Sequence, residues 1–332
     1  MKTSQAARLQ QPVPETNGSD LQLVPSPGEE GFLDGIGDFV LAHGTVEVPG
    51  AGDPVKYTVS VPEKLDSPVV HVIVPGFGGV KRSSRGLRNA LASLENLVAI
   101  SFEPARGGGI VRDLLNAQKV HADTLSAILQ DLPDNEELQE TPNGHELDLS
   151  QAVLLPHSMG SLSATERARL YPDETQSVIY MGSVGLGPKV MLGFIPRLLM
   201  SSSQDVAGKY AQGKLVPGAN RLDLAYRAAR YYLLNPRRTV GEIGSCFTAD
   251  IRKPVRLLDI LGVNTAALYF DADRLVPTDK STIAQVEEMV QICEVMEGYG
   301  HLAPQRHPFE VAARLGSISG RLEHAEQTAL AA

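Results

Sequence analysis

The sequence of 332 residues contains no Trp and only two Cys, Cys246 and Cys293. Two cysteines are too few for a disulfide framework, and neither lies in a C-x-x-C or Cys/His spacing typical of a metal site. We therefore expect both thiols to be reduced, and we expect neither a bound metal nor another cofactor. The absence of Trp also argues mildly against a carbohydrate-binding surface of stacked aromatic rings.

Long apolar runs and an excess of positive charge are missing as well. No stretch approaches the roughly 18 consecutive apolar residues of a membrane-spanning helix, and no basic segment followed by an apolar run opens the chain. We therefore expect no stable membrane insertion and a cytoplasmic location. The formal net charge of −9 disfavours nucleic acid as a partner, because such binding requires dense Lys and Arg. A small-molecule partner is the remaining expectation, and a homo-oligomer is compatible with the sequence.

The chain shows a change of pattern after its first residues. Residues 1–30 combine repeated Pro with polar residues and have no period of 2 or 3.6, which predicts a flexible N-terminal arm. The apolar alternation across 39–48 and 55–61 predicts an antiparallel strand pair at the edge of a sheet. Further buried strands are predicted at 71–74, 97–102, 152–155, 178–181 and 265–270, with helices near 84–94 and 111–131. Strands that alternate with helices indicate a mostly parallel sheet.

One region interrupts this alternation. Residues 186–250 contain helical patterns such as LDLAYRAARYYLLNP and no strand pattern. We predict a helical cap here, inserted between a first part of the core at 31–185 and a second part at 251–332. The alternative is that these helices only cover a face of the sheet.

A serine stands where the third of the later strands would turn into a helix. The segment Pro156-His157-Ser158-Met159-Gly160 resembles the G-x-S-x-G nucleophile elbow, in which small flanking residues allow strand and helix to approach closely. Pro156 stands where that pattern has Gly. A helix start also offers free N–H groups that assist an activated hydroxyl. The alternative role for Ser158 is that of an ordinary helix N-cap.

Glycines after the strand at 71–74 suggest a second part of a site. Pro75-Gly76-Phe77-Gly78-Gly79 supplies flexible backbone near a substrate. Backbone N–H groups stabilise the oxyanion of acyl transfer, and we predict those of Phe77 and Met159 as the two donors. Gly76 and His157 are predicted to contact the substrate. The alternative is an ordinary Gly-rich turn.

An acid and a histidine follow later in the chain. Asp273 lies just beyond the strand at 265–270, where open α/β sheets build their sites, and Asp271 is its rival. His301 lies on a loop beside Gly300, whereas His307 is followed directly by Pro308. We predict Ser158 as nucleophile, His301 as general base and Asp273 as the acid that orients it.

In combination, the segments from about 71 to 315 resemble the α/β-hydrolase superfamily. PGFGG is similar to its HG-x-G loop, with Pro75 where His is frequent, and Ala105-Arg106-Gly107 is similar to its Arg-Gly turn. PHSMG resembles the elbow, the segment from Asp273 to Pro277 resembles its acid motif, and Gly300-His301 resembles its histidine motif.

The resemblance implies an α/β-hydrolase fold, with a mostly parallel sheet of about eight strands, helices on both faces and a helical cap. It also implies an acyl-enzyme on Ser158, since the dehalogenase and epoxide hydrolase branches use Asp there. The expected activity is hydrolysis of a carboxylic ester or thioester of a small or medium acyl substrate. The alternatives are acyl transfer, C–C bond hydrolysis or perhydrolysis on the same residues, or ligand binding without catalysis. Lys81, Arg82, Arg85 and Arg88 are expected to form a solvated helix face, with attraction of an anionic substrate as the alternative.

Overall fold

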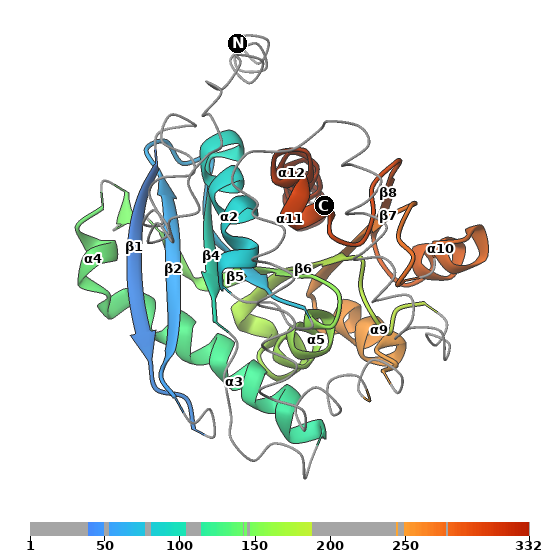
Figure 1. The fold of residues 1–332 in the computed structure, drawn as a ribbon, viewed down its shortest axis with the longest axis horizontal. Helices are drawn as coiled ribbons and strands as arrows, with labels where there is room; N and C mark the ends of the chain where they lie inside the picture. Colours follow the sequence, from blue (N-terminus) through green and yellow to red (C-terminus); the bar gives the residue numbers. More distant parts are fainter. Residues whose placement is uncertain are drawn as a thin grey trace, which may run out of the picture. The chain divides into compact units, whose positions relative to one another are not determined.

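The computed structural model describes residues 39–49, 53–76, 81–103, 114–141, 143–144, 147–187, 244, 249–276 and 278–331. These residues build an eight-stranded sheet of order β1-β2-β4-β3-β5-β6-β7-β8 (Figure 1). The strands are β1 (Phe39–Val46), β2 (Val55–Pro62), β3 (Ser67–Val74), β4 (Leu97–Phe102), β5 (Asp148–Pro156), β6 (Thr175–Met181), β7 (Asn264–Phe270) and β8 (Ile292–Met296). β2 is antiparallel to both β1 and β4, and the other pairs are parallel. The predicted α/β-hydrolase fold with a mostly parallel sheet is confirmed.

Helices cover both faces of this sheet (Figure 1). The described α-helices are α2 (Lys81–Glu95), α3 (Leu114–Asp131), α4 (Glu136–Gln139), α5 (Gly160–Leu170), α9 (Arg252–Ile260), α10 (Lys280–Glu287), α11 (Ala303–Arg306) and α12 (Pro308–Ala331). The short 3-10 turns η3 (Leu132–Asp134) and η5 (Pro172–Glu174) lie between them. Side chains of α2 and α12 share one apolar core, and those of α3, α5 and α9 share the other.

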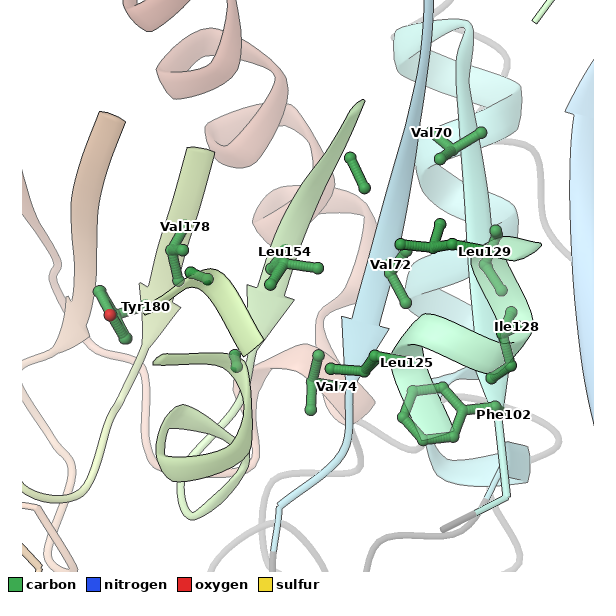
Figure 2. Packing of buried hydrophobic residues seen from close by; sticks show 14 of the residues in the cluster. Val70, Val72, Val74, Phe102, Leu125, Ile128, Leu129, Leu154, Val178 and Tyr180 are labelled. Carbon is green, nitrogen blue, oxygen red and sulfur yellow. The ribbon is translucent and has the colours of Figure 1, made fainter. Parts of the chain in front are cut away.

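The central strand β3 shows why its sequence is an almost continuous apolar run. Val70, Val72 and Val74 belong to the core that α3 covers, and Figure 2 shows them in one cluster with Leu125, Ile128 and Leu129. The alternate residues of β3 include Val69 and Ile73, which belong to the core that α2 and α12 cover. A parallel strand that is buried on both faces has no solvent side, so its sequence loses the polar alternation of an edge strand.

One expectation for α2 is wrong. Arg88 is fully buried, whereas the run of basic residues had been expected to form a solvated face. Its Nε donates to Ser60 Oγ at 2.9 Å and one terminal nitrogen donates to Ser101 Oγ at 3.0 Å. The guanidinium therefore points at the sheet, where hydroxyls of β2 and β4 replace its water.

Two predicted segments lie largely outside the described residues. The arm at 1–30 is not described, and of the cap at 186–250 only residues 186, 187, 244, 249 and 250 are. Both therefore stay predictions. In the described residues, no helix combines the length and apolar character needed to cross a membrane.

Candidate active site

The turn between β5 and α5 places Ser158 in a strained conformation. Its φ is +55°, in the left-handed region, where a residue other than glycine costs on the order of 1–3 kcal/mol. Two hydrogen bonds hold the turn: the His157 N–H donates to Val74 O, and the Ser158 N–H donates to Met181 O, both at 3.0 Å. The neighbouring strands β3 and β6 therefore impose the conformation that holds the buried serine at the carboxyl end of β5.

Glycines on both sides of this turn are required by close packing. A Cβ on Gly160 would lie 2.5 Å from Val74 O and 2.8 Å from Pro75 O. A Cβ on Gly76 would lie 2.7 Å from His157 O and 2.8 Å from Ser158 Cβ. Neither contact is tolerable against backbone, so α5 and the segment after β3 reach the serine only because these two positions lack side chains.

Pro156 fits at the position where the elbow pattern usually has Gly. It is the last residue of β5, is buried, and pairs with Val74 in the parallel register. The N–H groups of the next two residues, His157 and Ser158, supply the hydrogen bonds to the strands on both sides. The missing N–H of proline therefore leaves the turn intact.

Three side chains from separate parts of the chain form one hydrogen-bonded series. His301 Nε2 lies 2.9 Å from Ser158 Oγ, and His301 Nδ1 lies 2.6 Å from Asp273 Oδ2. An ionised carboxylate only accepts hydrogen bonds, so Nδ1 carries a proton and Nε2 is free to accept from the serine hydroxyl. The side chain of Asp273 is fully buried and that of His301 is 9% exposed, which shields the series from bulk water.

The geometry separates Asp273 from its rival Asp271. Asp273 Oδ1 accepts the N–H groups of Leu275 at 2.7 Å and Val276 at 3.0 Å, which directs Oδ2 toward His301. Asp271 Oδ1 instead accepts the N–H of Gly298 at 2.6 Å. The structure therefore brings Asp273 to the imidazole, while Asp271 braces the loop that precedes His301.

Of the two predicted oxyanion donors, Met159 lies within the described residues and Phe77 does not. The Met159 N–H follows Ser158 directly at the start of α5, and it has no hydrogen-bond acceptor among the described residues. Phe77 lies outside the described residues, so its N–H stays a prediction. Gly76 is among the described residues and packs closely against His157 and Ser158.

The His157 ring contacts the loop that carries His301, and the substrate contact predicted for this residue stays a prediction. His157 is 6% exposed, and its Nε2 lies 2.8 Å from the backbone O of His301. Its Nδ1 lies 3.4 Å from Nε2 of Gln305, a residue that no sequence motif indicated. Burial, followed by the proximity of His301, lowers the pKa of His157 to about 3. The ring thus joins the turn that carries Ser158 to the loop of His301.

Among the described residues, no group of three or more His, Cys, Asp or Glu side chains is arranged to hold a metal ion.

Comparisons with known proteins identify the fold. Comparison with curated protein sequences found no match. Solved structures with a similar fold include the naproxen esterase (carboxylesterase NP) of Bacillus subtilis, with 12% identity, a TM-score of 0.55, and coverage of 85% of this chain and 93% of that one. The 2-hydroxy-6-oxo-6-phenylhexa-2,4-dienoate hydrolase of Rhodococcus sp. strain RHA1 has 15% identity, a TM-score of 0.58, and coverage of 83% and 98%. The epoxide hydrolase VrEH1 of Vigna radiata has 13% identity, a TM-score of 0.55, and coverage of 85% and 98%.

At these identities the structural likeness establishes the fold and leaves the reaction open. The family assignment comes from the sequence itself, since the model of the alpha/beta hydrolase family matches residues 39–314, more than half of the chain. The chain therefore belongs to the alpha/beta hydrolase family.

Proposed function

We propose that the protein is a serine hydrolase that cleaves a carboxylic ester or thioester of a small or medium acyl substrate. The observation that carries this proposal is the series from Ser158 Oγ through His301 to Asp273, with separations of 2.9 and 2.6 Å. These distances lie within the range over which a base can take a proton from a nucleophile. The positive φ of Ser158 adds support, because a residue other than glycine is held there only when the surrounding structure imposes it.

The proposed reaction begins with attack of Ser158 Oγ on the substrate carbonyl while His301 Nε2 takes the hydroxyl proton. The buried carboxylate of Asp273 stabilises the imidazolium that forms and keeps its ring oriented. His301 then gives the proton to the departing alcohol or thiol, which leaves an acyl group on Ser158. Water attacks this acyl-enzyme with His301 as base, which releases the acid and restores the hydroxyl.

The proposed oxyanion site is formed by backbone N–H groups. The Met159 N–H is the donor for which the structure offers support, because it has no acceptor in the described residues and adjoins the nucleophile. A preorganised donor of this kind stabilises the transition state by roughly 3 kcal/mol. The Phe77 N–H is proposed as the second donor on the basis of the sequence. The segment 186–250 is proposed to shape the acyl pocket.

A panel of p-nitrophenyl esters of increasing acyl length tests the proposal. Wild-type protein should hydrolyse the shorter esters, and Ser158→Ala should lose this activity. Ser163→Ala is a matched control, because Ser163 is also buried on α5 but donates to Gly160 O at 3.2 Å, away from His301. The control should retain wild-type kcat, since its hydroxyl has no part in the reaction. Equal rates for wild type and Ser158→Ala would contradict the proposal.

The same panel distinguishes other reactions on this fold. Product analysis with added alcohol, amine or hydrogen peroxide would reveal acyl transfer or perhydrolysis if products other than the free acid dominate. Hydrolysis of a C–C bond would appear as turnover of a β-diketone without turnover of esters. Ligand binding without any turnover would identify a non-catalytic binding protein.

A further inference from the structure

The His157 side chain connects the two segments that carry the proposed nucleophile and base. His157 lies in the turn between β5 and α5, directly before Ser158, whereas His301 lies between β8 and α11. The His157 Nε2 lies 2.8 Å from the His301 backbone O, and the two ring centroids are 4.8 Å apart. The ring is therefore a direct link between the elbow and the histidine loop.

We infer that His157 is a positioning residue, whose Nε2–H holds the backbone carbonyl of His301 and thereby keeps the His301 imidazole in line with Ser158 and Asp273. This inference rests on the proposed function, because it assigns a role in the reaction of that site.

The local sequence explains why the His301 carbonyl depends on a side chain. In a turn that leads into a helix, the carbonyl of residue 301 would normally accept the N–H of residue 304 or 305. Residue 304 is Pro and has no N–H, and the Gln305 N–H donates to Leu302 O at 3.1 Å. Among the described residues, the His301 main chain has no backbone hydrogen bond. The His157 Nε2–H thus takes the place of the missing helical donor.

The loop before His301 is held by hydrogen bonds to the residues after β7, including the bond from the Gly298 N–H to Asp271 Oδ1. Gly298 has a φ of +80° and an added Cβ there would meet no atom within 4 Å, so this part of the loop is not fixed by packing. The Tyr299 O accepts the Ala272 N–H at 2.9 Å, and the Gly300 O accepts the Ala303 N–H at 2.9 Å. These bonds hold the residues on either side of His301, and among the described residues the bond from His157 is the one made to the backbone of His301.

Only one tautomer of His157 suits this role. A carbonyl oxygen accepts but cannot donate, so His157 Nε2 must carry a proton and Nδ1 is left as an acceptor in the neutral ring. The side-chain Nε2 of Gln305 lies 3.4 Å from Nδ1, on the side where a weak donor fits. Gln305 and the His301 carbonyl together therefore fix the protonation of the ring.

The charge state of His157 also suits a neighbour of a catalytic base. Burial is the main cause that lowers its pKa to about 3, and the nearby His301 lowers it further, while the His301 carbonyl and Asp273 act in the opposite direction. His157 is consequently neutral at neutral pH. A neutral ring can hold the loop without repelling the imidazolium that forms on His301.

Replacement of His157 by Phe separates positioning from simple burial. Phe retains an aromatic ring but has no donor for the His301 carbonyl. His71→Phe is the matched control, since His71 is a buried histidine of β3 whose burial lowers its pKa to about 4. Its ring nitrogens lie 3.2 Å from Val69 O and 3.2 Å from Ser319 Oγ, so it is fixed by hydrogen bonds but contacts none of Ser158, Asp273 and His301.

Three readouts are compared in the two variants: kcat and KM for a p-nitrophenyl ester, the kinetic pKa of kcat/KM, and the low-field proton NMR signal of the His301 Nδ1–H. For His157→Phe we expect kcat to fall by up to about 100-fold with KM little changed, as a misplaced general base requires. We also expect the kinetic pKa to shift and the low-field signal to broaden. His71→Phe should lower thermal stability while leaving all three readouts at wild-type values.

A further variant keeps the test decisive if Phe disturbs folding. His157→Gln retains an N–H donor and should recover part of kcat and of the low-field signal. The inference is overturned if His157→Phe folds and behaves like His71→Phe, or if His157→Gln recovers thermal stability without recovering the NMR signal. The NMR signal requires no turnover, so it tests the role of His157 even if wild-type protein hydrolyses no ester, a result that would count against the proposed function alone.

Discussion

Replacement of Asp273 by Asn exploits the detailed geometry of the carboxylate. Asp273 Oδ1 accepts two backbone N–H groups, from Leu275 and Val276, while Oδ2 faces His301 Nδ1 at 2.6 Å. In Asp273→Asn, the amide oxygen must occupy the Oδ1 position, because an NH2 group there would face two donors. The amide NH2 then points at His301 Nδ1 and can only donate to it.

This orientation forces the other tautomer of His301. Nδ1 becomes the acceptor and the proton moves to Nε2, 2.9 Å from Ser158 Oγ, where it can no longer take the hydroxyl proton. A wrong tautomer in a serine–histidine–acid system lowers kcat by about 10⁴-fold. We therefore expect a loss of about 10³- to 10⁴-fold in kcat, which corresponds to about 4–5 kcal/mol of transition-state stabilisation. Initial rates on the best p-nitrophenyl ester measure the loss, and thermal melting verifies that the variant is folded.

Asp271→Asn is the matched control for this experiment. Asp271 lies two residues earlier and accepts the Gly298 N–H at 2.6 Å, a bond that an Asn side-chain oxygen can also accept. We expect its kcat to stay close to that of wild type. The reasoning is refuted if Asp273→Asn retains wild-type kcat, or if Asp271→Asn loses more activity than Asp273→Asn.

Two further predictions concern stability. Burial lowers the pKa of His71 from 6.5 to about 4, so below pH 6.5 the unfolded chain binds a proton that the folded protein does not. The free energy of unfolding should therefore fall with decreasing pH, by about 2 kcal/mol between pH 7 and pH 5 for this residue alone. Urea unfolding of His71→Gln at both pH values should lack this part of the decrease, and an unchanged pH dependence would contradict the assignment. Gly160→Ala should lower the unfolding free energy by about 1–3 kcal/mol, because its Cβ would lie 2.5 Å from Val74 O. Gly320→Ala, in the exposed middle of α12 with no atom within 4 Å of the added Cβ, should instead raise it by about 0.5–1 kcal/mol, and equal effects would refute the packing argument.

The sheet was predictable from the sequence where its strands are buried on both faces. The apolar runs at 71–74, 97–102 and 265–270 are the cores of β3, β4 and β7. The strand β8, Ile292–Met296, was not predicted, because this edge strand is short and mostly half-exposed. Its place beside β7 depends on parallel pairing, which local sequence does not record.

The candidate site was predictable in its residue types and chain order. Ser158, Asp273 and His301 lie together in the structure, and their roles in catalysis stay proposals. The choice between Asp271 and Asp273 required the turn in which the Asp273 N–H donates to Phe270 O at 2.9 Å, since both residues follow β7. Sequence patterns specify neither side-chain direction within a turn nor contacts across it.

The hydrogen-bond partner of His157 could not be predicted from the sequence for a related reason. The substrate contact predicted for His157 stays a prediction, and no sequence pattern indicates which backbone group the ring contacts. The structure buries the ring against the His301 carbonyl, 144 positions further along the chain. The proline at position 304 indicates that the His301 carbonyl lacks a helical donor. This can be inferred only once the helix α11 is known to begin at Ala303.

Labelling with a fluorophosphonate probe, followed by mass spectrometry of the peptides, tests the proposed nucleophile most directly. The hydrogen bonds among Ser158, His301 and Asp273 predict one adduct, on Ser158, that is absent from Ser158→Ala. The rate of labelling should be strongly lowered in His301→Ala and unchanged in Ser163→Ala. An adduct on another serine, or labelling of His301→Ala at the wild-type rate, would contradict the proposal that the imidazole at 301 activates the hydroxyl at 158.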